Sequence, residues 1–119
     1  MPEHTGRHAF ADLWGCSFDL LNSVDMISLA ACTAAEEAGA TVLEVTAHQF
    51  EPHGVTVLVM LAESHLSVHT WPETGQAAVD AFTCGDADPL KAVHVLIDKL
   101  DPDEARLSQV DRMASLPLP

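Results

Sequence analysis

The chain has 119 residues, 48% of them hydrophobic and 5% aromatic, which is enough for one small domain with an apolar core. Eighteen Asp and Glu against five Lys and Arg give a formal net charge of −13. This charge argues against a nucleic-acid backbone or an anionic membrane as the partner and is compatible with a cationic small molecule. The cysteines Cys16, Cys32 and Cys84 form no CxxC pair, which favours reduced thiols over disulfides or a structural zinc site.

No export or membrane segment is indicated by the sequence. Met1 to His4 lacks a basic segment followed by an apolar one, and the longest nearly apolar run, Val55 to Ala62, is far below the roughly 20 residues that span a bilayer. We therefore expect a cytoplasmic protein.

In the first half of the chain we expect a strand, a helix and two further strands. The first strand covers Arg7–Leu13. A helix ending at Gly39 follows, because apolar residues recur at the spacing of one helical face, at Val24, Ile27, Ala31, Ala34 and Ala38. Thr41–Phe50 is rich in β-forming residues, and the turn signal Glu51-Pro52-His53-Gly54 separates it from a buried strand over Val55–Ala62.

In the second half of the chain we expect a strand with one apolar and one mostly polar face, and then a second helix. Along the strand, Leu66, Val68 and Thr70 alternate with His65, Ser67, His69 and Trp71. The turn Pro72–Gly75 then leads into Gln76–Thr83. Asp88 as the cap and Pro89 at the first position begin a helix whose apolar face is Leu90, Val93, Ile97 and Leu100. A weak strand near Ala105–Arg112 closes the chain.

These elements predict a single α+β domain over residues 1–119, in the order β-α-β-β-β-α-β. Short turns between successive strands imply an antiparallel sheet, and two helices with one apolar face each imply a two-layer sandwich with the helices on one side. The other side carries His and Trp rather than a purely charged pattern. We expect that face to pack against a second subunit, so that a site there is shared between two copies.

A series of motifs resembles one enzyme family. The run Glu63-Ser64-His65-Leu66-Ser67-Val68-His69-Thr70-Trp71-Pro72-Glu73 is followed by Phe82-Thr83-Cys84-Gly85 and preceded by Gly54-Val55-Thr56 and Gly6-Arg7-His8. In this order they resemble the small prokaryotic S-adenosylmethionine decarboxylases, which are pyruvoyl-dependent. The resemblance extends from about Gly6 to Leu100.

The resemblance implies a proenzyme that cuts itself between Glu63 and Ser64 into a β chain, 1–63, and an α chain, 64–119. The Ser64 hydroxyl attacks the Glu63 carbonyl carbon, and the amide becomes an ester. Removal of the Ser64 α-proton then breaks the ester and releases Glu63 with a new C-terminal carboxylate. Residue 64 becomes a covalently bound pyruvoyl group with loss of ammonia. The resemblance assigns the proton acceptor to His69 and a helper hydroxyl to Thr56, where the family often has Ser.

For catalysis, the resemblance implies that the pyruvoyl group forms a Schiff base with the substrate amine and accepts the electrons released with carbon dioxide. It assigns the proton donor to Cys84. Phe50 and Trp71 correspond to aromatic contacts for an adenine ring, and Glu73 to an acceptor for ribose hydroxyls. His48 lies on the same strand face as Phe50, and it either borders the pocket or serves only in packing. The product is the aminopropyl donor for spermidine synthesis, and the assembly is a homodimer of two α and two β chains.

Departures from the family pattern leave alternatives open. Thr74 and Gln76 stand where the family commonly has tyrosines, and Val57 where it has glycine. A decarboxylase of another cationic amino acid, ornithine or arginine, is therefore an alternative, as is a binding subunit that does not cleave. His65 and His69 share a strand face, but no third ligand at a regular spacing accompanies them, so we expect no metal. Cys16 and Cys32 are expected to be ordinary buried thiols.

Overall fold

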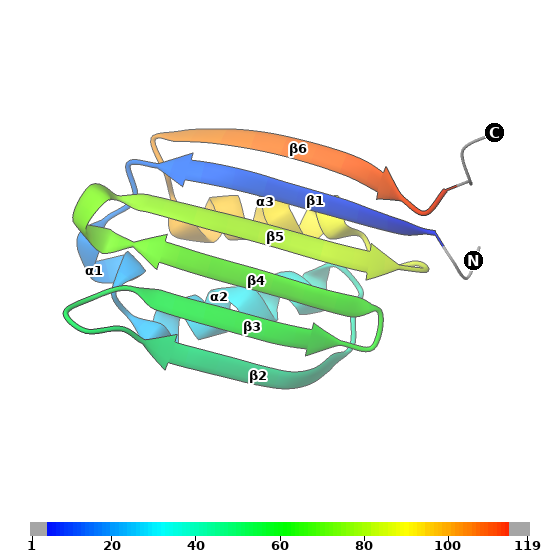
Figure 1. Ribbon diagram of the computed structural model, residues 1–119, viewed down its shortest axis with the longest axis horizontal. Coiled ribbons are helices and arrows are strands. Elements are labelled where there is room, and N and C mark those ends of the chain that lie inside the picture. The colour runs from blue at the N-terminus through cyan, green and yellow to red at the C-terminus, as the bar shows by residue number, and fades with distance from the viewer. Residues whose placement is uncertain (1–4, 115–119) are drawn as a thin grey trace.

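A single antiparallel sheet with helices on one side forms the molecule in the computed structural model, which describes residues 5–114 (Figure 1). The sheet has six strands in the order β2-β3-β4-β5-β1-β6. The elements in chain order are β1 (Gly6–Trp14), α1 (Phe18–Leu21), α2 (Val24–Glu37), β2 (Val42–Gln49), β3 (Val55–Leu61), β4 (Ser64–Trp71), η1 (Pro72–Thr74), β5 (Gln76–Cys84), α3 (Pro89–Leu100) and β6 (Glu104–Arg112). The α+β class and the one-sided helical cover expected from the sequence are confirmed.

The expected order of elements is one strand short. The segment Gln76–Cys84, which that order does not count, is β5, and it lies between β4 and β1 inside the sheet. The expected turn before it contains the short 3₁₀ helix η1, and α1 was not expected at all. Four residues are too few to show helical periodicity, so α1 has no signal beyond its Ser17 cap. The expectation that Met1–His4 carries no export signal concerns residues outside the described range.

The two long helices begin where their capping residues predict. The Asp88 side chain accepts hydrogen bonds from the backbone N–H groups of Leu90 and Lys91, with Pro89 in the first turn of α3. Ser23 accepts from the N–H of Met26 at the start of α2. Gly39, with φ at 80°, follows the end of α2 and turns the chain towards β2. No helix within residues 5–114 is long and apolar enough to cross a membrane.

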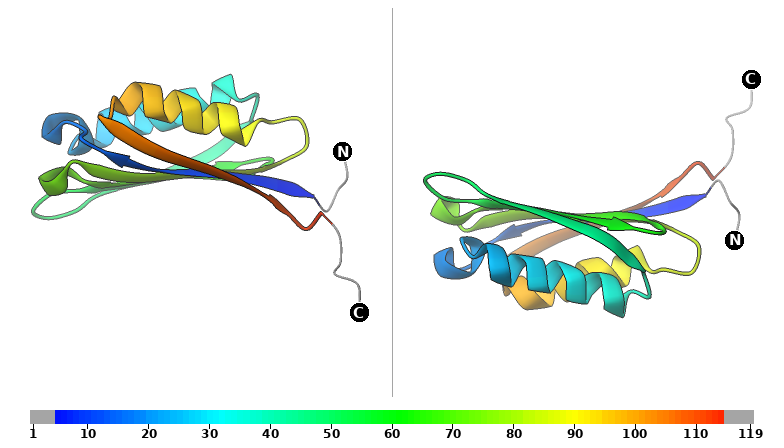
Figure 2. Two further views of the ribbon diagram at one scale, coloured as in Figure 1. Left: turned by 90° about the horizontal axis from the view of Figure 1, so that it is seen from above. Right: turned by 90° about the horizontal axis from the view of Figure 1, so that it is seen from below.

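The core lies between the helices and the face of the sheet that they cover (Figure 2). Alternate strand residues point into it, including Ala9 and Ala11 of β1, Val57 of β3 and Leu66 and Val68 of β4, all at most 1% exposed. From the helices it receives Ile27, Ala31, Ala34, Val93, Leu96 and Leu100. Many of the core side chains on β1 and α2 are alanines, whose small size allows a helix to pack close to a sheet.

Within residues 5–114, the helices leave the opposite face of the sheet uncovered (Figure 2). Large apolar side chains on that face are partly exposed: Phe10 at 39%, Leu58 at 47%, Met60 at 53%, Trp71 at 48% and Val110 at 48%. We call this face, formed by the outward residues of β1 to β6, the open face. Its apolar content is what a surface that packs against another molecule would carry.

We predict that Leu96→Ala in α3 lowers the free energy of unfolding by about 2–5 kcal/mol, because it leaves a cavity in the core. Leu96 is 0% exposed, whereas Leu29 in α2 is 69% exposed. Leu29→Ala is therefore the matched control, with an expected change within about 0.5 kcal/mol. Urea unfolding followed by circular dichroism measures both. Equal losses in the two variants would contradict the assignment of the core.

Candidate active site

The residues singled out in the sequence fall into two groups at opposite ends of the open face. β4 runs from Ser64 to Trp71, and the turns at its two ends lie at opposite sides of the sheet (Figure 1). Ser64 and His69 are five residues apart on this strand, which corresponds to roughly 16 Å at the usual strand rise. The structure thus separates His69 from the bond that it is expected to process.

The first group surrounds the Glu63–Ser64 peptide bond in the turn between β3 and β4. The backbone carbonyl oxygen of Glu63 accepts a hydrogen bond from the N–H of Cys84 at 3.0 Å. The Glu63 carboxylate accepts from the N–H of Thr41, also at 3.0 Å. The carbonyl carbon that Ser64 would attack is therefore held in place and polarised by a backbone donor, as in an oxyanion hole.

Ser64 has an unusual backbone conformation, with φ at 147°. A side chain at such a φ is strained by about 1–3 kcal/mol, and residues of this kind occur preferentially at active sites. Consecutive side chains of a regular strand point to opposite faces. Here the Ser64 Oγ instead lies 3.3 Å from Nδ1 of its neighbour His65, whose ring is on the open face.

Cys84 joins this group from the end of β5. Its neighbour Thr83 is paired with Ser64 across the β4–β5 ladder, and the Cys84 thiol is free and half-buried. The other two thiols lie elsewhere. Burial raises the pKa of the Cys16 thiol, with further contributions from Asp101 and Asp103, and burial also raises the pKa of the Cys32 thiol, beside Glu36.

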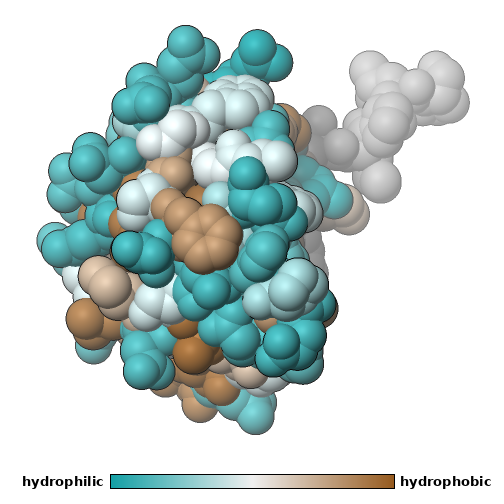
Figure 3. Space-filling view, turned by 90° about the vertical axis from the view of Figure 1, so that its left-hand side faces the viewer, coloured by the Kyte–Doolittle hydropathy of each residue, from teal (hydrophilic) through white to brown (hydrophobic). Residues whose placement is uncertain are grey.

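The second group lies at the other end of β4, where the turns after β2 and β4 meet. Thr56 Oγ1 and His69 Nδ1 are 3.1 Å apart, and the two residues are directly paired across β3 and β4. They line a cavity of about 230 Å³ together with Phe50, His53, Gly54, Thr70 and Trp71. The expected aromatic contacts and the expected proton acceptor are thus brought together. Figure 3 looks onto this end of the molecule, where apolar side chains are scattered among hydrophilic ones.

Glu73 extends this second group from η1. Its Oε2 lies 3.8 Å from Nε2 of His53, and its side chain is about half exposed. His48 stacks edge-on against Phe50, with ring centroids 4.6 Å apart. His48 therefore supports the ring of Phe50 and does not line the cavity of this group.

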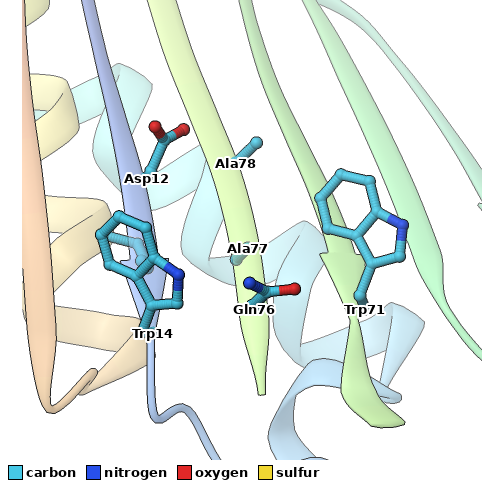
Figure 4. A pocket seen from close by; sticks show the side chains of 7 residues that line it. Asp12, Trp14, Trp71, Gln76, Ala77 and Ala78 are labelled. Carbon is cyan, nitrogen blue, oxygen red and sulfur yellow. The ribbon is translucent and has the colours of Figure 1, made fainter. Parts of the chain in front are cut away.

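Trp71 also borders a hollow on the open face that sequence analysis did not identify. Trp14 and Trp71 stand on either side of Gln76, with Asp12 and Ala78 farther along the strands (Figure 4). The hollow measures about 280 Å³. Trp14 was missed because it lies 57 positions from Trp71 in the chain, and only the pairing of β1 with β5 brings the two indoles to the same face.

A network centred on Asp80 lies between the two groups. Asp80 Oδ2 is 2.7 Å from His8 Nε2 and 3.4 Å from His65 Nε2, and Oδ1 accepts from the hydroxyl of Ser67. Burial raises the pKa of the Asp80 carboxyl, but the hydrogen bonds from Ser67 and His8 and the proximity of both histidines outweigh it, so this pKa lies below its ordinary value. The sequence suggested His65 and His69 as neighbours on one strand face, whereas in the structure the His65 ring shares Asp80 with His8.

His8, His65 and Asp80 are the group that could hold a metal ion within the described residues, with ligand atoms within 4.8 Å of one another. A ligating His normally donates its second ring N–H to an acceptor. Here Nδ1 of His8 lies 3.3 Å from Nη1 of Arg112, a donor. His8 Nδ1 must therefore accept, which leaves Nε2–H to donate to Asp80 and makes the group a poor cation site.

Comparisons with known proteins agree on one family. The family model described as S-adenosylmethionine decarboxylase matches residues 7–113. The S-adenosylmethionine decarboxylase proenzyme of Brevibacillus brevis is 49% identical over 108 residues, covering 90% of this chain and 81% of that protein. That of Carboxydothermus hydrogenoformans is 52% identical over 92 residues, covering 76% and 72%. The crystal structure of the adenosylmethionine decarboxylase from Aquifex aeolicus matches with a TM-score of 0.81 and 36% identity, covering 98% of this chain and 95% of that one.

We predict that Asp80→Asn destabilises the protein at neutral pH by about 1–2 kcal/mol. The reason is that an amide NH₂ group would then face the groups that donate hydrogen bonds to the carboxylate. A lowered folded-state pKa contributes stability that is complete above the ordinary carboxyl range, about pH 4, and is lost as the pH falls through the lowered pKa. The difference between wild type and variant should therefore shrink in acid. Urea unfolding at a series of pH values measures it, with Asp98→Asn on the exposed side of α3 as the control. A difference that does not change with pH would contradict the prediction.

Proposed function

The chain belongs to the S-adenosylmethionine decarboxylase family, and we propose that it is a proenzyme that cleaves itself between Glu63 and Ser64 and then decarboxylates S-adenosylmethionine. The product would serve as the aminopropyl donor for spermidine synthesis. The names of the relatives favour this substrate over ornithine or arginine, and their description as proenzymes favours a cleaving chain over a binding subunit. The cytoplasmic location expected from the sequence stays a prediction.

The observation that carries the proposal is the geometry of the Glu63–Ser64 bond. Converting an amide into an ester is uphill, so the reaction needs a destabilised peptide or a stabilised oxyanion. The positive φ of Ser64 supports the first, and the N–H of Cys84 on the Glu63 carbonyl oxygen supports the second. The Thr41 N–H on the Glu63 carboxylate would hold the leaving segment in position.

We assign the removal of the Ser64 α-proton to His69, with Thr56 as its positioning partner. The Thr56 hydroxyl lies 3.1 Å from Nδ1 of His69 and would orient the ring so that Nε2 is directed at the proton. Because His69 and Ser64 of one chain lie roughly 16 Å apart along β4, this step requires the His69 of another chain.

A homodimer formed through the open faces meets this requirement. A two-fold axis that lies between two stacked sheets and crosses the strands places the Ser64 end of one sheet opposite the His69 end of the other. Stacked sheets lie about 10 Å apart, which facing side chains can bridge. The partly exposed Phe10, Leu58 and Met60 on that face support such a contact. After cleavage, the assembly would hold two α and two β chains.

The residues around position 64 fit a pyruvoyl group. Residue 64 is paired with Leu61 on β3 and Thr83 on β5, so it would stay anchored after the chain is cut. The pyruvoyl group supplies an electrophilic carbonyl that withdraws the electrons released with carbon dioxide. The thiol of Cys84, next to Thr83, would return a proton to the substrate carbon.

The second group of residues would bind the nucleoside part of the substrate. The rings of Phe50 and Trp71 are both about half exposed, and both line the cavity beside His69. Two such aromatic faces suit a flat heterocycle and a neighbouring sulfonium. Glu73, also half exposed, would accept hydrogen bonds from ribose hydroxyls.

We predict that the purified chain converts from 12.7 kDa into two fragments, and that the cleaved protein releases carbon dioxide from S-adenosylmethionine. Ser64→Ala should stay intact and inactive, because no oxygen remains to attack Glu63. Denaturing mass spectrometry and a side-by-side assay with S-adenosylmethionine, ornithine and arginine measure these outcomes. A wild-type chain that stays whole, or release from the other two amino acids only, would refute the proposal.

We also predict that two inactive variants complement each other. Ser64→Ala and His69→Ala should each stay uncleaved alone. In a mixed dimer, Ser64 of the His69→Ala chain faces His69 of its partner, so the His69→Ala chain alone should be cut. Co-expression followed by mass spectrometry detects the 64–119 fragment that carries the His69→Ala substitution. Mixed dimers that form but contain no cut chain would show that the site is not shared.

A further inference from the structure

We propose that His65 is the base that accepts the hydroxyl proton of Ser64 in the first step of self-cleavage, and that Asp80 is its positioning residue. The inference rests on the proposed function, because it concerns the attack on the Glu63–Ser64 bond. It is distinct from the role assigned to His69, which acts on the Ser64 α-carbon in the following step.

The first observation is a continuous chain of contacts from the nucleophile to a carboxylate. Ser64 Oγ lies 3.3 Å from His65 Nδ1, and His65 Nε2 lies 3.4 Å from Asp80 Oδ2. A hydroxyl that donates to Nδ1 leaves Nε2–H to donate to the carboxylate. This is the arrangement of nucleophile, base and orienting acid that activates a serine in hydrolases.

The second observation is that Asp80 is held in place by groups that do not take part in the attack. The Ser67 hydroxyl donates to Oδ1, and Nε2–H of His8 donates to Oδ2 at 2.7 Å. Nη1 of Arg112, 3.3 Å from Nδ1 of His8, fixes the tautomer of His8. Asp80 is therefore kept ionised and oriented towards His65, and the His65 ring is limited to one productive orientation.

The third observation is that, among the described residues of the same chain, His65 supplies the basic side chain in contact with the Ser64 hydroxyl, while the partner's His69 is assigned to the α-carbon. His69 of the same chain lies roughly 16 Å away along β4. The Glu63 carboxylate is turned to Thr41, whose N–H it accepts at 3.0 Å. The unusual φ of Ser64 brings its hydroxyl to the His65 ring on the open face. The strained backbone thus serves the attack twice, by destabilising the peptide and by presenting the hydroxyl to a base.

The step balances as an N-to-O acyl shift. As Ser64 Oγ bonds to the Glu63 carbonyl carbon, its proton passes to Nδ1 of His65, and Asp80 stabilises the resulting imidazolium. The carbon–nitrogen bond between Glu63 and Ser64 then breaks, and His65 returns the proton to the departing amine of Ser64. The product is the Glu63 ester of the Ser64 hydroxyl with a free amine on residue 64, and no oxidant or co-reactant is consumed.

The test is the rate at which freshly synthesised full-length chain is cut, measured by denaturing mass spectrometry. His65→Ala and His65→Gln should each slow cleavage by about 10²–10⁴-fold, the usual contribution of a general base. His94→Ala, an exposed histidine on α3, is the matched control and should cleave like wild type. Thermal unfolding by circular dichroism confirms that each variant is folded.

Added imidazole separates a chemical role from a structural one. His65→Ala leaves a space the size of an imidazole ring beside Ser64, so free imidazole that enters this space should restore cleavage in proportion to its concentration. It should have no effect on Ser64→Ala. A folded His65→Ala chain that is slow but is not restored by imidazole would overturn the role of His65 as the base.

Asp80→Asn tests the positioning role. Alone it should slow cleavage by about tenfold or more, and in the His65→Ala background it should add no further slowing, because Asp80 acts through His65. Full additivity of the two changes would mean that Asp80 acts only on the fold, and the positioning role would fail.

Hydroxylamine assigns the step. The His69→Ala chain should stop at the ester intermediate, which hydroxylamine splits into two fragments. The double variant His65→Ala/His69→Ala should give no such fragments. If wild type cleaves and His65→Ala cleaves at the same rate, the inference fails while the proposed function stands. If wild type never cleaves, both fail. An ester that forms as fast without His65 would also overturn the inference.

Discussion

The hydrogen bond from the Cys84 N–H to the carbonyl oxygen of Glu63 is the contact on which the geometry of the candidate active site depends. It connects the β3–β4 turn to the end of β5 and polarises the peptide bond at which we propose that the chain is cut. The register of β4 against β5, with Ser64 opposite Thr83, places that donor opposite the turn. A shift of register by one residue would turn every side chain of β4 to the other face and remove the donor from the bond.

The one-sided cover of the sheet explains where the polar groups are. The helices bury one face, so the strand residues that point to that face are apolar or carry hydrogen-bonded hydroxyls, such as Thr70 and Thr83. His8, His65, His69, Asp80 and the two tryptophans are left to the open face. There they form two groups and a network between them, and the distance between the groups makes a second copy a functional requirement of the proposed chemistry rather than only a source of extra buried surface.

Particular residues show how far sequence reasoning reached. The cap of α3 at Asp88 and the end of α2 before Gly39 were predicted, because both depend on neighbours within a few positions. The pairing of Thr56 with His69 follows from a short hairpin and could be expected. The association of His65 with His8 and Asp80 could not, because it depends on β1 entering the sheet beside β5 and on the register of three strands.

By itself, the sequence determined the fold class, the family and the bond at which the chain is expected to cut, since these follow from local periodicity and from a contiguous motif around Ser64. Only the tertiary structure decided that the Glu63 carbonyl oxygen meets a backbone donor from the end of β5, and that two histidines from different strands contact the Asp80 carboxylate. The physical reason is that side-chain alternation is a local property, whereas strand order and register are set by burial of the whole core.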